Sequence, residues 1–297
     1  MGIPGRQEWI PCFEDAIRKR GMGDDPVRPG GAVWQAVKRR IPSRFYNGLR
    51  RHLLPVYYRV FPSPPLSSGP EIGHFSGFEL AYRKGTTDED VIRHSFDRDI
   101  FFAGVPEYSP TSDHTILDVG AHIGTFALLA ASKVPQGRVY AIEACKESFN
   151  LLRINIALNK TPNIEASHLA LSDRQGTCTL HHDRGNWGHS IIAPMTGHGE
   201  IVEMSSLAHF VRSRGITKCH FMKLNCEGAE FPILLGAPSP VLQLFQVILT
   251  LYHCDIVRKQ SEQDLSRHLQ ASGFTVAIRN TTQERGWIIA VNAASHP

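Results

Sequence analysis

From Thr115 onward, short apolar segments that favour strands alternate with longer segments that favour helices. This alternation predicts βαβ units, in which parallel strands form one sheet and helices cover its faces. The predicted strands are 115–119, 138–142, 164–169, 220–224, 245–251, 274–279 and 287–291. The predicted helices are 125–132, 146–158, 227–235 and 261–272. We therefore expect an α/β fold with a mostly parallel sheet.

The chain before this region divides into two further parts. Residues 34–60 carry seven Lys and Arg without Asp or Glu, and the proline-rich segment 61–70 has the composition of a linker. We predict a basic helical appendage with its linker over 1–70, and an entry hairpin and helix packing on the core over 71–112. The main domain is then expected over 113–297.

The segment ILDVGAHIG, residues 116–124, runs from an apolar strand through a glycine turn into a helix. Such a turn presents backbone N–H groups to a ligand. The dinucleotide fingerprint G-x-G-x-x-G requires glycine where His122 stands, which argues against a nicotinamide-dependent oxidoreductase. Asp118 favours a cationic ligand, such as a nucleoside that bears an amino acid. Glu143 follows Gly120 at about the spacing of a carboxylate that accepts ribose hydroxyls.

These motifs resemble the FkbM-type methyltransferases, S-adenosylmethionine-dependent enzymes that mostly O-methylate sugars and other small natural products. The resemblance rests on DVGAHIG (118–124), YAIEA (140–144), LLRINIALN (151–159), LALSD (169–173), KLNCEGAE (223–230) and LLGA (234–237). It implies a seven-stranded Rossmann-like methyltransferase sheet that ends in an antiparallel hairpin. It also implies S-adenosyl-L-methionine as the cofactor.

The same resemblance implies which residues bind the cofactor. They are Asp118, Gly120, His122, Gly124, Glu143, Ala144, Leu171, Ser172, Asp173 and Asn225. Asp118 and the glycines would surround the methionine portion, Glu143 the ribose, and 171–173 the adenine edge. Two positions depart from the family pattern, because His122 replaces the usual Asn and Asn225 replaces the common Asp. A neutral amide at Asn225 weakens any role there as a base or metal ligand.

The catalytic candidates follow the fourth and fifth predicted strands, where open α/β sheets place their sites. We expect His253 as general base, with Glu227 and Asn225 beside it and Glu230 in contact with the acceptor. The alternative for His253 is a strand-end histidine bonded to backbone. The alternative for both glutamates is a favourable charge at a helix N-terminus.

The insertion 177–204 is rich in His and Gly and is expected to form a hairpin or lid rather than part of a sheet. Asn186, Trp187 and Ser190 would meet a sugar-like acceptor through stacking and hydrogen bonds. The insertion also contains four histidines, His181, His182, His189 and His198. Without Cys or carboxylate partners at ligand spacing, they predict a solvated loop and no metal site.

The leading hypothesis is an O-methyltransferase whose partner is a small hydroxylated acceptor. An RNA methyltransferase is the alternative suggested by the basic segment, although nucleic acid is the less favoured partner. A scaffold that binds the cofactor without turnover is the alternative suggested by Asn225. The six cysteines are spaced singly, and no apolar run is long enough to span a membrane. We therefore expect reduced thiols, no membrane span and a cytoplasmic protein.

Overall fold

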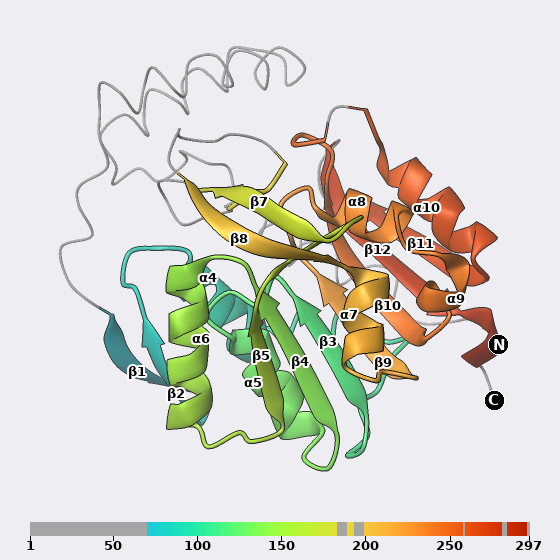
Figure 1. Ribbon diagram of the computed structural model, residues 1–297. Helices are drawn as coiled ribbons and strands as arrows, with labels where there is room; N and C mark the ends of the chain where they lie inside the picture. The colour runs from blue at the N-terminus through green and yellow to red at the C-terminus, as the bar shows by residue number, and fades with distance from the viewer. Residues whose placement is uncertain (1–69, 183–188, 193–198, 258, 281–283, 296–297) are drawn as a thin grey trace, which may run out of the picture. The chain divides into compact units, whose positions relative to one another are not determined.

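The computed structural model describes residues 70–182, 189–192, 199–257, 259–280 and 284–295 (Figure 1). The expected basic appendage, and with it the alternatives for the basic segment, lies outside the described residues. So do Asn186, Trp187 and His198. None of the described helices combines the length and the hydropathy that crossing a membrane requires.

The main sheet has seven strands in the order β11-β12-β10-β9-β3-β4-β5. Their bounds are β3 Thr115–Val119, β4 Arg138–Glu143, β5 Ile164–His168, β9 Cys219–Leu224, β10 Phe245–His253, β11 Phe274–Asn280 and β12 Arg285–Asn292. The strands from β10 to β5 are parallel, whereas β12 pairs antiparallel with β10 and with β11. The predicted mostly parallel sheet with a C-terminal antiparallel hairpin is confirmed.

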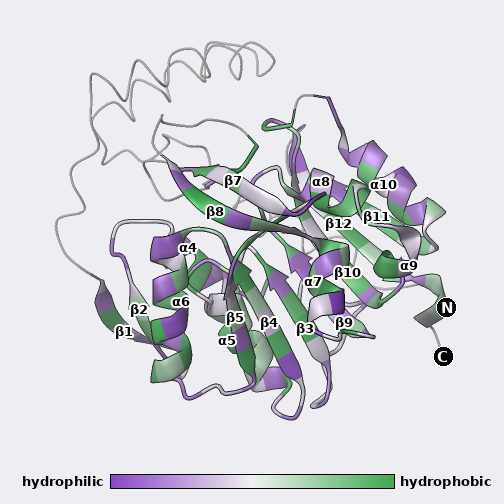
Figure 2. Cartoon of the chain, in the orientation of Figure 1, coloured by the Kyte–Doolittle hydropathy of each residue, from purple (hydrophilic) through white to green (hydrophobic). Residues whose placement is uncertain are grey.

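Apolar side chains cover both faces of the central strands, which are mainly hydrophobic in Figure 2. On β9, Phe221 stacks on Tyr108 at a ring distance of 4.7 Å, whereas its neighbour Met222 belongs to the apolar core on the other face. The helices that follow the strands are α5 Thr125–Lys133, α6 Lys146–Leu158, α7 Leu207–Ser213, α8 Glu230–Leu235, α9 Ser239–Leu242 and α10 Glu262–Ala271.

Helix α8 begins three residues later than predicted, at Glu230 rather than at 227. Glu227 and Gly228 have φ angles of 47° and 100°, in the left-handed region, so the chain turns there before the helix starts. The turn keeps Glu227 at the end of the sheet instead of placing it on the helix.

Residues 71–97 form a hairpin and a short helix. The strands are β1 Glu71–Phe75 and β2 Phe78–Tyr82, and α4 Asp88–Ile92 continues into a wider helical turn over Arg93–Asp97. The buried side chain of Asn155 on α6 accepts a hydrogen bond from the Ala81 N–H at 2.6 Å and donates to the Ile123 carbonyl at 2.8 Å. One amide thus joins the hairpin to the glycine turn after β3.

The insertion forms a hairpin, as predicted, but the expectation that it would not be part of a sheet is wrong. Strands β7 Gly176–His181 and β8 Gly199–Ser206 pair antiparallel, and β8 also pairs with β6 Ala170–Ser172 in a second, three-stranded sheet. Leu180, Val202 and Met204 alternate inward to an apolar cluster that includes Cys145, which explains why the sheet forms. In Figure 1 this sheet lies next to the carboxyl ends of β3 and β4.

Candidate functional site

The candidate site lies where the direction of strand addition reverses. From β3 the chain adds β4 and β5 on one side, and later adds β9 and β10 on the other. Open α/β sheets bind their ligands outside the carboxyl ends of the strands at such a reversal. Most of the predicted site residues follow β3, β4, β9 and β10, and they therefore converge at one edge.

A buried ion pair lies under the glycine turn. Lys223 on β9 donates hydrogen bonds from Nζ to Asp118 Oδ1 and to the Gly120 carbonyl, each at 2.8 Å. Both side chains are almost completely buried, and burial raises the pKa of Asp118 above its ordinary value despite the adjacent cation. Among the described residues, Asp118 Oδ2 has no hydrogen-bond partner. The second oxygen is therefore left to accept a bond from a ligand.

The turn itself requires its glycines. A Cβ on Gly120, whose φ is 77°, would lie 2.1 Å from the Asn225 carbonyl oxygen. A Cβ on Gly124 would lie 2.4 Å from the Leu152 side chain. Side chains are thus excluded where the turn contacts the loop after β9 and helix α6.

His122 occupies this turn in a left-handed conformation with φ of 55°. Its Nε2 lies 3.4 Å from Asp88 Oδ1, but burial lowers the pKa of the ring to about 4. The imidazole is therefore neutral at physiological pH and offers one donor and one acceptor, as the amide of the family's Asn does.

Glu143 ends β4 with its carboxylate turned toward the glycine turn. Its two oxygens accept the N–H groups of His122 at 2.7 Å and Cys145 at 2.8 Å. Burial raises the pKa of Glu143, and the charge of Asp118 adds to this effect. The two acidic residues thus share one edge of the sheet. Each carboxylate oxygen has a further lone pair with which it can accept a hydroxyl.

These groups fit S-adenosylmethionine. The buried atoms without a hydrogen-bond partner in the described part of the chain include Asp118 Oδ2 and Asn225 Oδ1, both of which are acceptors. The amino acid and ribose of the cofactor bring ammonium and hydroxyl donors. The N–H groups of Gly120, Ala121, His122 and Gly124 are bonded within the protein, so the fit rests on the two free acceptors and on Glu143.

The residues expected at the adenine edge differ in burial and in hydrogen bonding. The Leu171 side chain is buried in the apolar core, and Ser172 donates to Asp173 at 3.3 Å. Asp173 also contacts Arg174 at 3.3 Å. The Ala144 carbonyl accepts a hydrogen bond from His168 Nε2 at 2.9 Å. The Leu171 side chain is thus withdrawn from a ligand, whereas the Asp173 carboxylate is exposed.

His253 at the end of β10 is fully buried between two glutamates. Its Nδ1 lies 2.9 Å from Glu230 Oε1 and its Nε2 lies 3.4 Å from Glu227 Oε1. Burial opposes the charged ring, but the two carboxylates outweigh it and raise the pKa of His253 to about 9. The ring is therefore protonated at neutral pH and has no lone pair. This geometry does not suit the general-base role that we expected of His253.

Glu230 is also fully buried, and its second oxygen accepts the Gly228 N–H at 3.0 Å. With both oxygens engaged, it holds His253 and the turn rather than a substrate. Ser190, another expected acceptor contact, is fully buried as well, and its hydroxyl donates to the Glu227 carbonyl at 2.8 Å. Ser190 thus fastens the insertion to the loop after β9.

The sequence hypothesis missed the cation on the other side of Glu227. Arg285 at the start of β12 donates to Asp255 at 2.7 Å, and its Nη1 lies 3.8 Å from Glu227 Oε2. The signal was present in the predicted hairpin, because an antiparallel β12 brings its first residue beside the end of β10. Glu227, with 14% of its side chain exposed, lies between two buried or half-buried cations.

A seven-stranded sheet of this order, with acidic residues at its switch point and a glycine turn between them, defines an α/β protein of the methyltransferase class. A family model described as "Methyltransferase FkbM domain" matches residues 118–280, which is more than half of the chain. The chain belongs to the FkbM methyltransferase family. It is a methyltransferase, and its cofactor is S-adenosylmethionine.

Two relatives carry the same activity in their names. Methyltransferase sdnD of Sordaria araneosa is 25% identical over 51% of this chain and 71% of its own length. Methyltransferase 1 of Beauveria bassiana is 25% identical over 61% of this chain and 80% of its own length. Among solved structures, methyltransferase FkbM from Methylobacillus flagellatus KT is 15% identical with a TM-score of 0.44, covering 88% of this chain and 58% of that one.

Proposed function

We propose that this methyltransferase transfers its methyl group to a hydroxyl oxygen of a sugar or another small natural product. The observation that carries the proposal is the carboxylate of Glu227, which is held partly exposed at the switch point of the sheet. An attacking alcohol must lose its proton, and a carboxylate within hydrogen-bond reach can accept it.

The proposed proton acceptor is Glu227 rather than His253. Its Oε1 faces His253 Nε2 at 3.4 Å and its Oε2 faces Arg285 Nη1 at 3.8 Å, so both oxygens have a fixed direction. The left-handed backbone at Glu227 supports the assignment, because strained residues gather at functional sites. His253 and Arg285 are then positioning residues that hold the carboxylate without touching the acceptor.

The cofactor supplies a methyl group on a positively charged sulfur, and transfer to oxygen leaves a neutral thioether. The chain's own contribution is to bind, to align and to exclude water. We assign Asp118, Gly120 and Asn225 to the amino-acid end and Glu143 to the ribose. The insertion covers the acceptor side, since Ser190 joins it to the carbonyl of Glu227.

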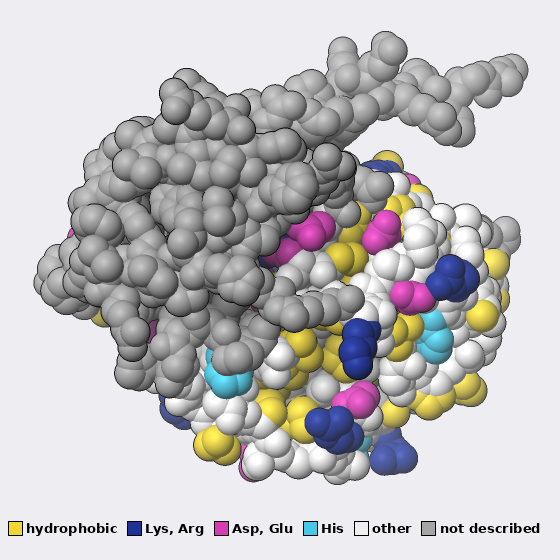
Figure 3. Space-filling view, turned by 90° about the horizontal axis from the view of Figure 1, so that it is seen from above, with side chains coloured by type: hydrophobic (Ala, Val, Ile, Leu, Met, Phe, Trp, Pro, Cys, Tyr) yellow, Lys and Arg dark blue, Asp and Glu magenta, His cyan; other side chains and the backbone are white. Residues whose placement is uncertain are grey.

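A small acceptor is favoured over RNA by the described surface. On the part of the described surface that Figure 3 shows uncovered, acidic and basic side chains are interspersed among hydrophobic ones. Nucleic-acid sites gather basic residues on one face. We also propose a reducing compartment such as the cytoplasm, because the described cysteines, Cys145, Cys178, Cys219, Cys226 and Cys254, are free thiols.

The proposal is tested in two steps on the full chain. Calorimetric titration with S-adenosylhomocysteine measures cofactor binding, and a labelled-methyl screen then compares hydroxylated metabolites with RNA. We expect binding, followed by transfer to hydroxyl compounds. Transfer to RNA alone would overturn the small-acceptor proposal, and binding without any transfer would indicate a scaffold.

A matched pair of variants tests the proton acceptor. Glu227→Gln keeps the size of the side chain and removes its basicity, so turnover should fall roughly 100- to 10,000-fold while S-adenosylhomocysteine still binds. Glu203→Gln alters an exposed glutamate on β8 and should leave both unchanged. Full turnover in Glu227→Gln would show that another group takes the proton.

A further inference from the structure

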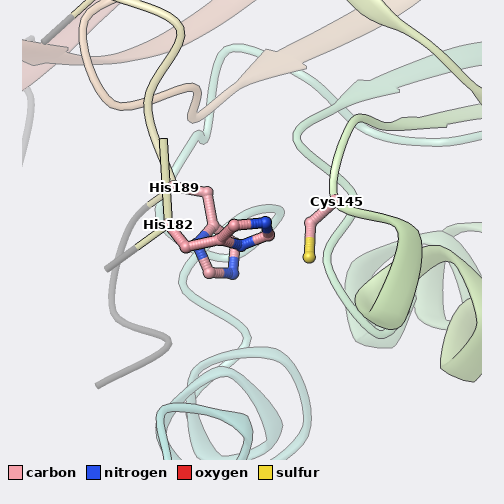
Figure 4. Close-up of side chains that lie close together, drawn as sticks. All are labelled: Cys145, His182 and His189. Atoms are coloured by element: carbon pink, nitrogen blue, oxygen red, sulfur yellow. The ribbon is translucent and has the colours of Figure 1, made fainter. Parts of the chain in front are cut away.

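We propose that Cys145, His182 and His189 form a binding site for a single zinc ion between the end of β4 and the insertion. One ligand atom from each residue lies within 4.8 Å of the other two. Figure 4 shows the two imidazole rings together, with the thiol of Cys145 facing them from a different segment of the chain. This inference does not depend on the identity of the methyl acceptor.

The backbone brings the two histidines together. His181 and Ser190 form an antiparallel bridge, with N–H to carbonyl distances of 2.9 and 3.1 Å in the two directions. The next residues inward from this bridge are His182 and His189, so they begin the loop as neighbours. Their rings are 4.8 Å apart between centroids and nearly perpendicular, at 79°. A perpendicular pair can direct one nitrogen from each ring to a common point.

The third ligand comes from the main sheet. Cys145 is buried two residues after Glu143, in an apolar cluster with Leu180 and Val202 of the hairpin. Packing of the hairpin on this cluster holds the thiol against the histidines. The sequence hypothesis rejected a metal site because neither Cys nor carboxylate partners stand at ligand spacing from the histidines. The fold supplies one from a residue 37 positions before His182.

The donor set selects the metal. One sulfur and two imidazole nitrogens suit zinc, whereas magnesium and calcium require oxygen ligands. Zinc bonds of about 2.0–2.3 Å place tetrahedral ligands about 3.3–3.7 Å apart, so closing the site requires side-chain movements of roughly 1 Å. Three protein ligands leave the fourth position for water or a substrate group, as in zinc sites that act on a ligand.

The protonation states of His189 and Cys145 determine whether zinc binding releases a proton. Burial lowers the pKa of His189 to about 3, so its ring is neutral at physiological pH and can donate a lone pair. Burial raises the pKa of the Cys145 thiol to about 11, so the sulfur keeps its proton until a metal arrives. Binding forms a zinc–sulfur bond and releases the thiol proton to the solvent. Affinity should therefore rise with pH.

The surroundings of the proposed zinc site suit a bound cation. The Glu200 carboxylate lies 3.7 Å from His182 Nε2 and accepts the Lys146 N–H at 2.9 Å. Carboxylates beside a ligating histidine orient the ring and increase its basicity. A bound ion would fix the insertion to the residue that follows Glu143 and Ala144, and so to the edge of the cofactor crevice.

The test uses the full chain after removal of metals with a chelator. Zinc titration by calorimetry should give one equivalent with proton release. Cobalt should give the near-ultraviolet thiolate band and the visible bands of a tetrahedral complex. Cys145→Ser should abolish the thiolate band, and His189→Gln should weaken zinc binding by more than the roughly 10- to 100-fold typical of outer-shell changes.

Two control variants are matched to these ligands. Cys178→Ser and His181→Gln change a thiol and an imidazole on β7 that are not members of the cluster, and both should bind zinc as the unaltered chain does. The proposal is overturned if the unaltered chain gives no thiolate band with cobalt. It is equally overturned if His189→Gln and Cys145→Ser bind zinc with unchanged affinity, because the ion would then lie elsewhere.

Discussion

The pH dependence of stability should reveal the imidazolium between the two glutamates. The folded protein raises the pKa of His253 from an ordinary 6.5 to about 9, because Glu227 and Glu230 outweigh the cost of burial. The folded state therefore binds this proton more tightly than the unfolded state. The resulting stability is present in full below pH 6.5 and is lost as the pH rises through about 9. The loss amounts to about 3 kcal/mol, at about 1.36 kcal/mol per pH unit.

The assay is urea unfolding of the full chain between pH 6 and 9.5, compared with His253→Gln. The unaltered protein should lose about 3 kcal/mol across this range, whereas the variant should lose much less. At pH 6.5 the variant should already be less stable by about 3–5 kcal/mol, because it leaves the buried carboxylate of Glu230 without its cation. His74→Gln, at an exposed position on β1, is the control and should keep the full pH dependence. An unaltered protein whose stability does not change over this range would refute the reasoning without any variant.

Three further predictions concern the frame of the site. Lys223→Met should lower the free energy of unfolding by about 3–5 kcal/mol, because it leaves Asp118 buried without a cation, and chemical denaturation should detect this; a loss below about 1 kcal/mol, typical of exposed pairs, would contradict the geometry. Asn155→Ala should lower the free energy of unfolding by about 1–3 kcal/mol, because it leaves buried backbone groups unpaired. Thermal unfolding should show this as a lower midpoint temperature. Gly120→Ala should abolish S-adenosylhomocysteine binding in calorimetry, because the new Cβ would lie 2.1 Å from the Asn225 carbonyl; retained binding would show that the two loops can separate.

The alternation of apolar strand segments with helical segments predicted a mostly parallel sheet, and the family resemblance added its antiparallel hairpin. Strand β3 and helix α6 have the predicted bounds, since each is a regular apolar segment between clear turn signals. The start of α8 was misplaced because Glu227 and Gly228 adopt left-handed backbone in a segment whose composition favours a helix. The second sheet was missed because the segment 177–204 was interpreted from its His and Gly content as a hairpin or lid. Its inner residues also pack on Cys145, a contact that no local pattern contains.

The site divides in the same way. The motifs predicted that Asp118 and Glu143 lie near each other, because the carboxyl ends of parallel strands share one edge of the sheet. They did not reveal the protonation of His253, which depends on two carboxylates and on complete burial. They also did not reveal that Lys223 pairs with Asp118, or that Cys145 lies near two histidines. Such pairs join residues that are distant in the sequence. The protonation states of these residues depend on burial and on neighbouring charges, which residue type alone does not predict.

The three-stranded sheet formed by β6, β7 and β8 has a consequence for protein engineering. The chain forms this sheet after β5 and then continues through α7 to β9 of the main sheet. The Ser206 hydroxyl caps the first turn of α7. Strands β3 and β4, which carry Asp118 and Glu143, and strand β9, which precedes Glu227, contribute no backbone pairing to it. Under the proposed function, in which the insertion covers the acceptor side, we expect hairpins grafted from other family members between 176 and 206 to change acceptor preference while cofactor binding is retained. Grafts that keep Ser190 will preserve the link to the loop after β9.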